Sequence, residues 1–270
     1  MNIHLFKDSQ KIDFEKAVSA GYFSADSFNI FESIRTYHGK PFKIDEHLKR
    51  LGESAKTVGL ELPTELEHIR TELNQCIKKV PKGEYFIRIT VTTESVLILF
   101  VPGKEYPAEI YTEGVRVTTV PTLRNSANSA FPPAKTSNFL NQIMGTIDPV
   151  SDGAFEIIFR GSDGTLQEAR TWNFFIVKNG ALKTPPTMGI LSGVTRKFVI
   201  ELAAHLHIPF EEVPLTKYEA YNADEAFLTN TSGEIVPIRD WDGRKIGVKI
   251  PGPVTKRLHA EYRKRTKNEN

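Results

Sequence analysis

The segment FNIFESIRTYHGKPFKIDEHLKRLGESAKTVGL, residues 28–60, contains both kinds of regular secondary structure within one short stretch. Residues 28–43 are typical of two strands around a His38-Gly39-Lys40 turn. Residues 44–60 have the period of an amphipathic helix, with an apolar face formed by Leu48, Leu51, Ala55 and Val58. The first third of the chain therefore mixes strands and helices, as expected of an α/β (α+β) fold.

The same mixture continues with a second predicted helix over residues 61–80. In residues 85–92 the side chains alternate between two faces, so that Phe86 and Arg88 share one face. The run VLILFV, residues 96–101, is apolar on both faces, which predicts a strand inside a sheet rather than at its edge.

A loop-like stretch, PGKEYPAEIYTEG at residues 102–114, contains two prolines and two glycines. We place there the boundary between a smaller N-terminal α/β domain, residues 1–107, and a larger C-terminal domain, residues 108–270. The larger domain alternates predicted strands with a helix over 192–206. It also contains a long loop, of which residues 121–134 are predicted to form an active-site loop, because long loops in compact domains often carry function.

The composition limits the partners of the protein. The chain has 35 Lys and Arg against 33 Asp and Glu, and a net charge of +2 gives no field for nucleic acid or an anionic membrane. Cys76 is the single cysteine, and the seven histidines show no ligand spacing, so neither a disulfide nor a metal is expected. The polar start and the short apolar runs predict neither a secretory signal nor a membrane helix, hence a cytoplasmic protein.

Four features could carry chemistry, although each alone is more often structural. Arg50 flanks the apolar face of the 44–60 helix, on a side that it shares with His47 and Ser54. Residues 192–195 begin a helix, where backbone N–H groups can bind a phosphate or be satisfied by an ordinary cap. The other two features are a lysine in the long loop and a glutamate beside a turn, Lys135 and Glu168.

Taken in order along the chain, seven segments resemble those of the class IV aminotransferases, the fold-type IV pyridoxal-phosphate enzymes. This family includes branched-chain aminotransferases, D-amino acid aminotransferases and aminodeoxychorismate lyases. The segments are IFESIRTYHGKPF, EHLKRLGESA, AKTSNFLNQ, GTLQEARTWNFFIVKNGALKTPP, GILSGVTRKFVIELA, DEAFLTNTSGEIVPI and PGPVTKRL. The resemblance covers residues 28–262 and implies a two-domain fold whose larger domain has a pseudo-barrel sheet. It also implies a homodimer and pyridoxal 5'-phosphate as the cofactor.

The resemblance also implies roles for single residues. Lys135, in AKTSNFLN, matches the lysine that forms a Schiff base with the cofactor and shuttles the substrate proton. Glu168, in QEARTWN, matches the carboxylate that faces the pyridine nitrogen and keeps it protonated. The residues that match the phosphate-binding group are Arg50, Val194, Thr195 and Thr231.

Substrate contacts follow from the same resemblance. Backbone groups of Thr231 and Ser232 match the segment that holds the substrate carboxylate, and Arg88 matches a strand arginine near that carboxylate. Phe31 and Phe86 would form an apolar wall around the substrate side chain. From the sequence alone, a core role for the two phenylalanines and a surface role for Arg88 remain open.

Three departures from the family pattern bear on specificity. The usual G-D-G is replaced by residues 26–29, and Trp172 replaces a small polar residue just before Asn173. The arginine-plus-histidine carboxylate trap of D-amino acid aminotransferases is missing at residues 92–94. Ser33 follows Glu32 where lyases often have a hydroxyl residue, which leaves a lyase activity open.

We therefore expect an aminotransferase that moves an amino group from a hydrophobic or branched-chain amino acid to a 2-oxo acid. The reaction would run through a lysine aldimine and a pyridoxamine phosphate form of the cofactor. One alternative is an aminodeoxychorismate lyase that forms 4-aminobenzoate and pyruvate. Another is a protein that binds the cofactor without transaminating. The expected partners are small-molecule amino and oxo acids, not nucleic acid or membrane.

Overall fold

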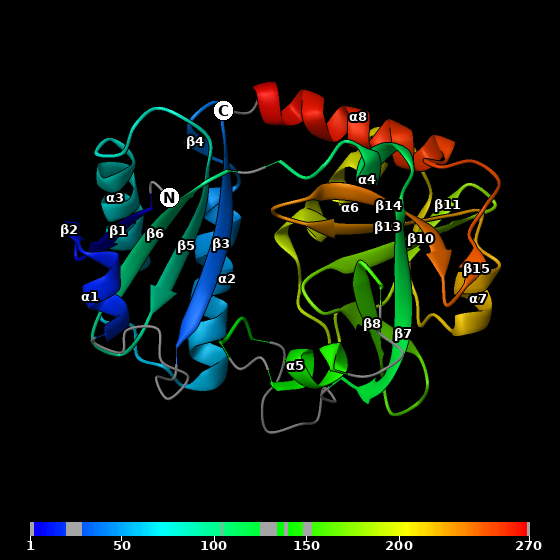
Figure 1. Ribbon diagram of the computed structural model, residues 1–270, viewed down its shortest axis with the longest axis horizontal. Helices are drawn as coiled ribbons and strands as arrows, with labels where there is room; N and C mark the ends of the chain where they lie inside the picture. Colours follow the sequence, from blue (N-terminus) through cyan, green and yellow to red (C-terminus); the bar gives the residue numbers. More distant parts are fainter. Residues whose placement is uncertain are drawn as a thin grey trace. The chain divides into compact units, whose positions relative to one another are not determined.

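The computed structural model describes residues 3–19, 29–103, 105–124, 134–137, 140–147 and 153–268. These residues divide into two units (Figure 1). Unit 1 takes the described residues within Met1–Lys104, Ala134–Asn138 and Thr266–Asn270. Unit 2 takes those within Glu105–Pro133 and Phe139–Arg265. A short piece that contains Lys135 thus belongs to unit 1, although it follows the first strand of unit 2 in the sequence.

The sheet of unit 1 is antiparallel throughout its described strands. Its spatial order is β2 (Gln10–Ile12), β1 (His4–Lys7), β6 (Val96–Pro102), β5 (Tyr85–Val91), β3 (Ile30–Tyr37) and β4 (Lys40–Pro41). Its helices are α1 (Phe14–Ser19), α2 (Ile44–Val58) and α3 (Leu66–Ile77). The predicted strand pair 28–43 corresponds to β3 and β4, of which residue 28 lies outside the described residues.

Strand β6 explains how this sheet is covered. Its even-numbered side chains, such as Ile98, are buried in the core that α2 and α3 form with the strands. Its odd-numbered side chains, Leu97 and Leu99, pack with Leu5 and Ala17, the latter from α1. The prediction that VLILFV forms an internal strand is confirmed, since β6 pairs with β1 on one side and β5 on the other.

Helix α2 presents two neighbouring stripes to the interior of unit 1. Leu48, Leu51 and Ala55 form the predicted apolar stripe and lie in the core. The side chains beside this stripe are polar and also buried: His47, Arg50 and Ser54. The helix ends at Gly59, whose φ of 68° is a left-handed conformation that glycine adopts without strain. The polar stripe is where a site can form.

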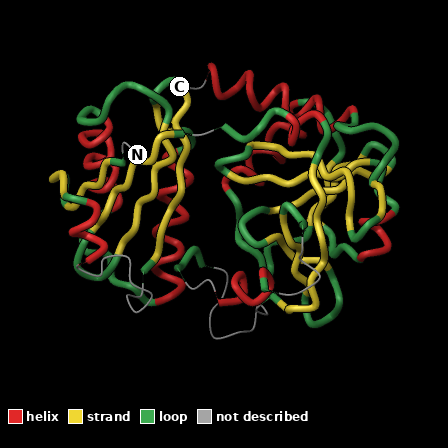
Figure 2. Tube along the Cα trace, in the orientation of Figure 1, coloured by secondary structure: helices red, strands yellow, loops and turns green. Residues whose placement is uncertain are grey.

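Unit 2 is built on a curled, mixed sheet (Figure 2). The described strands follow the order β12 (Phe210–Glu212), β11 (Ala181–Thr184), β10 (Asn173–Lys178), β13 (Glu225–Asn230), β14 (Glu234–Trp241), β7 (Val115–Leu123), β8 (Glu156–Arg160) and β9 (Leu166–Ala169), with β15 (Arg244–Lys245) paired to β14. The pairs β11–β12, β14–β7 and β7–β8 are parallel, and the others are antiparallel. The turn at Asn179-Gly180 joins β10 to β11, with positive φ at both residues as a tight hairpin requires.

Five described helices accompany this sheet: α4 (Glu109–Thr112), α5 (Leu140–Thr146), α6 (Val194–His205), α7 (Lys217–Tyr221) and α8 (Pro253–Asn268). The carboxylate of Glu225 accepts hydrogen bonds from the backbone N–H groups of Val254 and Thr255, which fixes the start of α8. A ring contact between Phe198 and Tyr262 joins α6 to α8. Among the described helices, none has the length and apolar character needed to cross a membrane.

The apolar stripe of α2 should dominate the stability of unit 1. Leu51 is fully buried, so Leu51→Ala should lower the free energy of unfolding by about 2–5 kcal/mol. Lys49→Ala is the matched control, because its side chain is 72% exposed and its loss should change stability by less than about 0.5 kcal/mol. Urea titration of both variants checks this, and equal effects would contradict the packing described for α2.

Candidate active site

Lys135 is held on the edge of the unit 1 sheet by main-chain hydrogen bonds. The N–H of Phe31 donates to the Lys135 carbonyl at 2.9 Å, and Thr136 forms a β-bridge with Ile30. The N–H of Lys135 itself donates to Oγ of Ser54 on α2 at 3.1 Å. The lysine segment thus acts as a short added strand beside β3, which fixes the lysine backbone from two sides.

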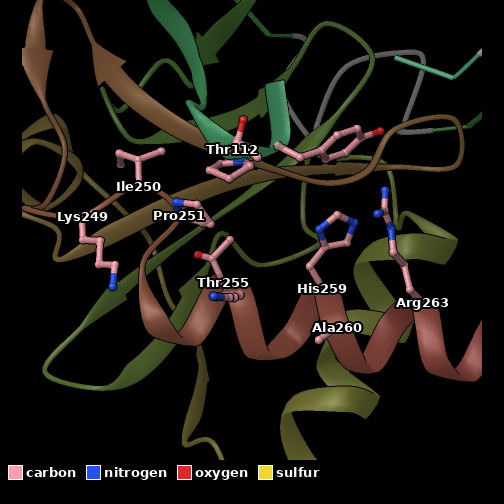
Figure 3. Close-up of a pocket in the computed structure, with 11 residues that line it drawn as sticks. Thr112, Lys249, Ile250, Pro251, Thr255, His259, Ala260 and Arg263 are labelled. Carbon is pink, nitrogen blue, oxygen red and sulfur yellow. The ribbon is translucent and has the colours of Figure 1, made fainter. Parts of the chain in front are cut away.

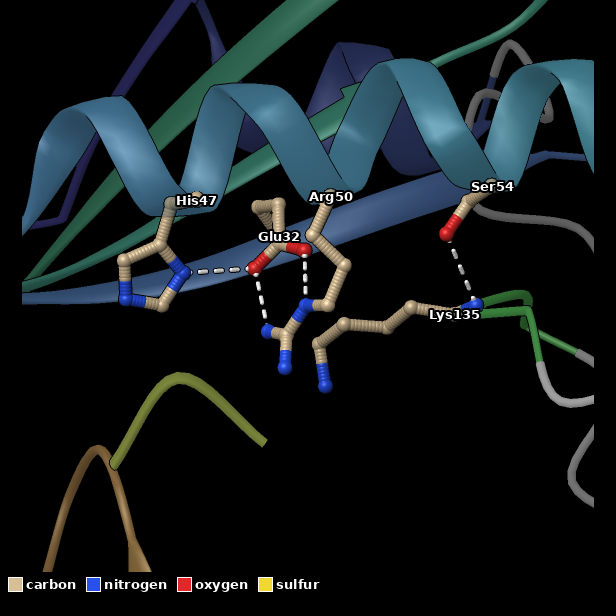
Figure 4. A network of polar contacts seen from close by, with 5 residues as sticks. All are labelled: Glu32, His47, Arg50, Ser54 and Lys135. Carbon is tan, nitrogen blue, oxygen red and sulfur yellow. Dashed lines mark hydrogen bonds and ion pairs between the residues drawn. The ribbon is translucent and has the colours of Figure 1, made fainter. Parts of the chain in front are cut away.

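The Lys135 amine lies near an aromatic ring and other cations. Its Nζ is 4.6 Å from the centroid of the Phe31 ring, and the guanidinium carbon of Arg88 is 3.8 Å from the same centroid. Figure 4 shows the lysine side chain running beside the guanidinium of Arg50. A lysine acts as a nucleophile through its neutral amine, so its surroundings matter for that role.

A buried carboxylate organises the polar stripe of α2 (Figure 4). Glu32, on β3, is fully buried, and its two oxygens accept hydrogen bonds from Nε and Nη2 of Arg50, each at 2.7 Å. Nδ1 of His47 lies 2.7 Å from the Oε2 atom of Glu32. Two of the three residues predicted to share one side of α2, His47 and Arg50, therefore meet at a glutamate to which the sequence analysis gave no role, while Ser54 binds Lys135.

The charges in this cluster are set by burial and by one another. Burial raises the pKa of Glu32, but the charge and hydrogen bonds of Arg50, helped by His47, outweigh it and lower that pKa to about 2. Burial lowers the pKa of His47, against the opposing effect of Glu32, and so favours the neutral imidazole. An ionised Glu32 can only accept, so Nδ1 of His47 carries the proton and donates it.

The position of Arg50 changes what is expected of it. The sequence predicts a residue that flanks the apolar face of the helix, whereas the structure buries Arg50 to 8% exposure against Glu32. The edge of the guanidinium that carries Nε and Nη2 is committed to this ion pair. A phosphate bound at Arg50 would share the guanidinium with Glu32, which would hold it in a fixed orientation.

Arg88 lies on the opposite face of the sheet from Glu32. It shares its face of β5 with Phe86, as predicted, and donates to Oγ1 of Thr90 and to Oγ of Ser137 at 3.2 and 3.1 Å. Burial lowers the pKa of Arg88. Through Ser137, Arg88 touches the segment that carries Lys135, so the lysine segment contacts both faces of the sheet at its edge.

In unit 2, Glu168 is held by three groups. Its Oε2 accepts from the backbone N–H of Leu191 at 3.1 Å and from Nδ2 of Asn173 at 3.3 Å. Nη2 of Arg124 lies 2.7 Å from its Oε1, and the glutamate is 4% exposed. These donors favour the ionised carboxylate that the sequence analysis expects at this position.

Asn173 links this carboxylate to the start of α6. Its Nδ2 also donates to the Leu191 carbonyl at 3.1 Å. A Cβ atom on Gly193 would lie 2.1 Å from Oδ1 of Asn173, so only glycine fits at this N-cap. Val194 and Thr195 follow directly and are buried at the first turn of the helix. The structure therefore brings Glu168 and the predicted phosphate-binding helix start together within unit 2.

Thr231 and Ser232 lie in the turn between β13 and β14, at the same end of the sheet. Asn173 pairs with Thr229, and the turn begins two residues beyond Thr229, at Thr231. Oδ1 of Asn230 accepts from Oγ of Ser232 at 3.1 Å and from the Gly233 N–H at 2.7 Å. Asn173, the first residue of β10, thus contacts Glu168 and Gly193 and pairs with Thr229, close in the chain to the other predicted unit 2 site residues.

Sequence reasoning missed several residues of both clusters. Glu32 and Asn173 lie inside quoted motifs, yet no spacing rule indicates that they bind Arg50 or Leu191. Arg124 is the single charged residue of the predicted active-site loop, residues 121–134, yet nothing local points to its ion pair with Glu168. Of the departures noted in the sequence, residues 26–28 lie outside the described residues, as do residues 125–133 of the predicted active-site loop.

A separate cavity of about 440 Å³ lies in unit 2 (Figure 3). His259 and Arg263 of α8 line it, together with Tyr111 and the segment Lys249–Pro251. None of the predicted site residues lines this cavity. In the part of the chain that the structure describes, no group of three or more His, Cys, Asp or Glu side chains is placed to hold a metal ion.

The family model of the class IV aminotransferases matches residues 29–241, which contain the motifs of both clusters. The chain belongs to the class IV aminotransferases. The family resemblance seen in the sequence is confirmed, and the relatives support the predicted transaminase.

Three similar proteins illustrate the range of the family. The putative branched-chain-amino-acid aminotransferase of Methanocaldococcus jannaschii is 34% identical over 249 residues, which cover 87% of this chain and 85% of that protein. A D-alanine aminotransferase of Bacillus licheniformis is 30% identical over 247 residues, covering 86% and 85%. The solved T.th. branched-chain amino acid aminotransferase with pyridoxamine 5'-phosphate has a TM-score of 0.89 at 25% identity, covering 99% and 95%. The predicted fold-type IV architecture is confirmed.

The ion pair of Glu32 and Arg50 should show strong coupling. Arg50→Ala leaves a buried carboxylate and Glu32→Gln leaves a buried guanidinium, so each should destabilise the protein by about 3–5 kcal/mol. The double variant leaves neither charge buried without its partner. Its loss of stability should therefore be smaller than the sum of the losses of the two single variants by about 1–3 kcal/mol. Urea titration of the four proteins measures this difference, and simple additivity would show that the pair contributes no coupling.

Ionised Glu32 also predicts a pH dependence. Its pKa is about 2 in the folded chain against a usual value of 4.5, so its stabilisation is complete above about pH 4.5 and is lost as the pH falls towards 2. Over that interval the parent should lose on the order of 3 kcal/mol more stability than Glu32→Gln. Both proteins should carry His47→Gln, which removes the titration of the imidazole. If the free energy of unfolding of the two proteins changed with pH in the same way, an ionised Glu32 would be contradicted.

Proposed function

We propose that this aminotransferase uses pyridoxal 5'-phosphate and acts on hydrophobic or branched-chain amino acids and their 2-oxo acids. The observation that carries the proposal is the fixed placement of Lys135. Its backbone is bound to β3 and to Ser54, and its amine lies 4.6 Å from the centre of the Phe31 ring. A lysine held this firmly, over the same aromatic ring as the Arg88 guanidinium, suits covalent attachment to an aldehyde.

The donor set of the chain fits this cofactor. Unit 1 supplies a primary amine and a guanidinium, from Lys135 and Arg50. Unit 2 supplies a buried carboxylate, Glu168, and the N–H groups at the start of α6, with Thr231 as a further donor. An amine for the aldehyde, a carboxylate for the pyridine nitrogen, and a cation with N–H donors for the phosphate are the groups that pyridoxal phosphate requires.

The residues of the chain would divide the work as follows. When bound, the cofactor supplies an electron sink that stabilises negative charge at the substrate α carbon. Nζ of Lys135 accepts the proton that leaves this carbon and returns it. The Glu168 carboxylate, oriented by Leu191 and Asn173, holds a proton on the pyridine nitrogen. Arg50, oriented by Glu32, and the α6 N-terminus bind the phosphate dianion.

Substrate recognition would use the residues that the family resemblance indicates. We assign the α-carboxylate to Arg88 and to the turn at Thr231 and Ser232. The side chain of the substrate would meet Phe31 and Phe86, which share a sheet face with Arg88. Two aromatic rings beside a carboxylate-binding cation favour an apolar substrate, which supports the branched-chain preference. We also propose a homodimer, which sedimentation velocity would test.

A lyase remains the second candidate because of Ser33. In the sheet register Ser33 pairs with Arg88, so its hydroxyl lies on the face that carries Phe31. Such a hydroxyl could contact a bound aminodeoxychorismate. Release of 4-aminobenzoate and pyruvate from that compound, without a second substrate, would favour the lyase over the aminotransferase.

The decisive experiment mixes the cofactor-loaded protein with L- and D-leucine, L-valine and L-aspartate and records the absorbance of the cofactor. We expect a change with the L-branched amino acids, reversed by their 2-oxo acids. Lys135→Ala should bind the cofactor but react about 10²–10⁴-fold more slowly. In the parent protein, borohydride reduction followed by peptide mapping should find the label on Lys135.

Lys49→Ala is the matched control for this experiment, since Lys49 lies on the exposed side of α2 and should leave the rate unchanged. A borohydride label on another lysine would overturn the assignment of Lys135. A response to D-leucine alone would overturn the proposed chirality and leave the lysine assignment standing.

A further inference from the structure

Trp172 is a large apolar side chain in the segment that precedes β10. It lies between β9 and β10, next to Asn173, and is 4% exposed. Its ring centroid is 6.1 Å from that of Tyr106 and 5.8 Å from that of Phe155. The three rings form a cluster whose geometry is fixed by packing, so the indole has little freedom to move.

The far edge of the indole lies directly against the turn between β13 and β14. A Cβ atom added to Gly233 would be 2.0 Å from Cη2 of Trp172 and 2.8 Å from its Cζ3. Real Cβ atoms do not approach heavy atoms so closely, so no residue larger than glycine fits at 233 while the indole is present. The φ of Gly233 is not positive, so the glycine is required here by space rather than by backbone conformation.

Hydrogen bonds hold the rest of this turn in place. Oδ1 of Asn230 accepts from the Gly233 N–H and from Oγ of Ser232, and the hydroxyl of Tyr106 is 3.5 Å from the same Oγ. Thr231 and Ser232 therefore lie between an asparagine cap at one end and the indole at the other. Any shift of the indole would be passed to the backbone of these two residues.

We propose that Trp172 and Gly233 are a matched pair that sets the position of Thr231 and Ser232, and with it the affinity for the α-carboxylate of amino and oxo acids. The proposal rests on the proposed function, which assigns carboxylate binding to this turn. Trp172 acts through the turn and is therefore a positioning residue. Donors for a carboxylate must be held within about 0.5 Å to be effective, which is the tolerance that a rigid ring cluster can provide.

An ordinary core role would have different consequences. If Trp172 only fills the interior, then shortening it lowers stability and leaves carboxylate affinity unchanged. Trp241 offers a matched comparison, because it is fully buried in the same core cluster and donates from Nε1 to Oγ1 of Thr119, away from the turn. Trp172→Phe and Trp241→Phe remove the same atoms from two different places.

The first test measures binding of 4-methylpentanoate, a branched-chain carboxylate without an amino group, to the cofactor-loaded proteins by calorimetry. Trp172→Phe should weaken binding at least tenfold, whereas Trp241→Phe should stay within twofold of the parent even where its thermal midpoint falls. Equal affinities of the two variants would overturn the proposal. Failure of the parent to bind any carboxylate would overturn the proposed function itself, and this inference with it.

The second test examines the pairing. Gly233→Ala should weaken 4-methylpentanoate binding at least tenfold in the parent, and less than threefold in the Trp172→Phe background, where the clashing edge of the indole is gone. The thermal midpoint of the cofactor-free proteins should show the same pattern, independently of activity. If Gly233→Ala weakened binding and lowered the thermal midpoint equally in both backgrounds, the proposal of a matched pair would be overturned. If Gly233→Ala alone does not fold, rescue of folding by Trp172→Phe supports the pair and no rescue opposes it.

Discussion

The buried ion pair between Glu32 and Arg50 is the constraint on which unit 1 depends. A fully buried carboxylate is tolerated only with charged and hydrogen-bonded partners, so β3 and α2 must meet with Arg50 and His47 facing Glu32. Ser54, one turn further along α2, then has a fixed position from which it accepts the N–H of Lys135. The electrostatic requirement of one glutamate thus determines where the lysine backbone is held.

Unit 2 also contains a buried carboxylate, Glu168, and there the amide of Asn173 takes the place that the imidazole of His47 has beside Glu32. Asn173 donates to Glu168 and to the Leu191 carbonyl, and its side chain leaves room only for glycine at the α6 N-cap. In both units a strand supplies the buried carboxylate, and neighbouring polar groups orient it. Each cluster pairs its carboxylate with an arginine. In unit 1 the pair fixes the Arg50 guanidinium, and in unit 2 it holds the Glu168 carboxylate in place.

Periodicity predicted the elements better than their contacts. The 3.6-residue period of α2 correctly grouped Arg50 with His47 and Ser54, and the alternation of 85–92 correctly grouped Arg88 with Phe86. A period identifies the face of an element but not the group across from it. The pairing of Glu32 with Arg50, of Arg124 with Glu168, and of Lys135 with Phe31 depends on tertiary packing between distant segments. Only the family resemblance pointed to Lys135 and Glu168.

The edge position of the Lys135 segment has a consequence for the order of folding during synthesis. The strands of unit 1 emerge from the ribosome before residue 135, so β3 has an uncovered edge beside Ile30 until the lysine segment arrives. An open strand edge can pair with another chain, and closing a loop of this length is slow compared with local pairing. The segment that contains Lys135 therefore also ends a period in which the nascent sheet is exposed to misassembly.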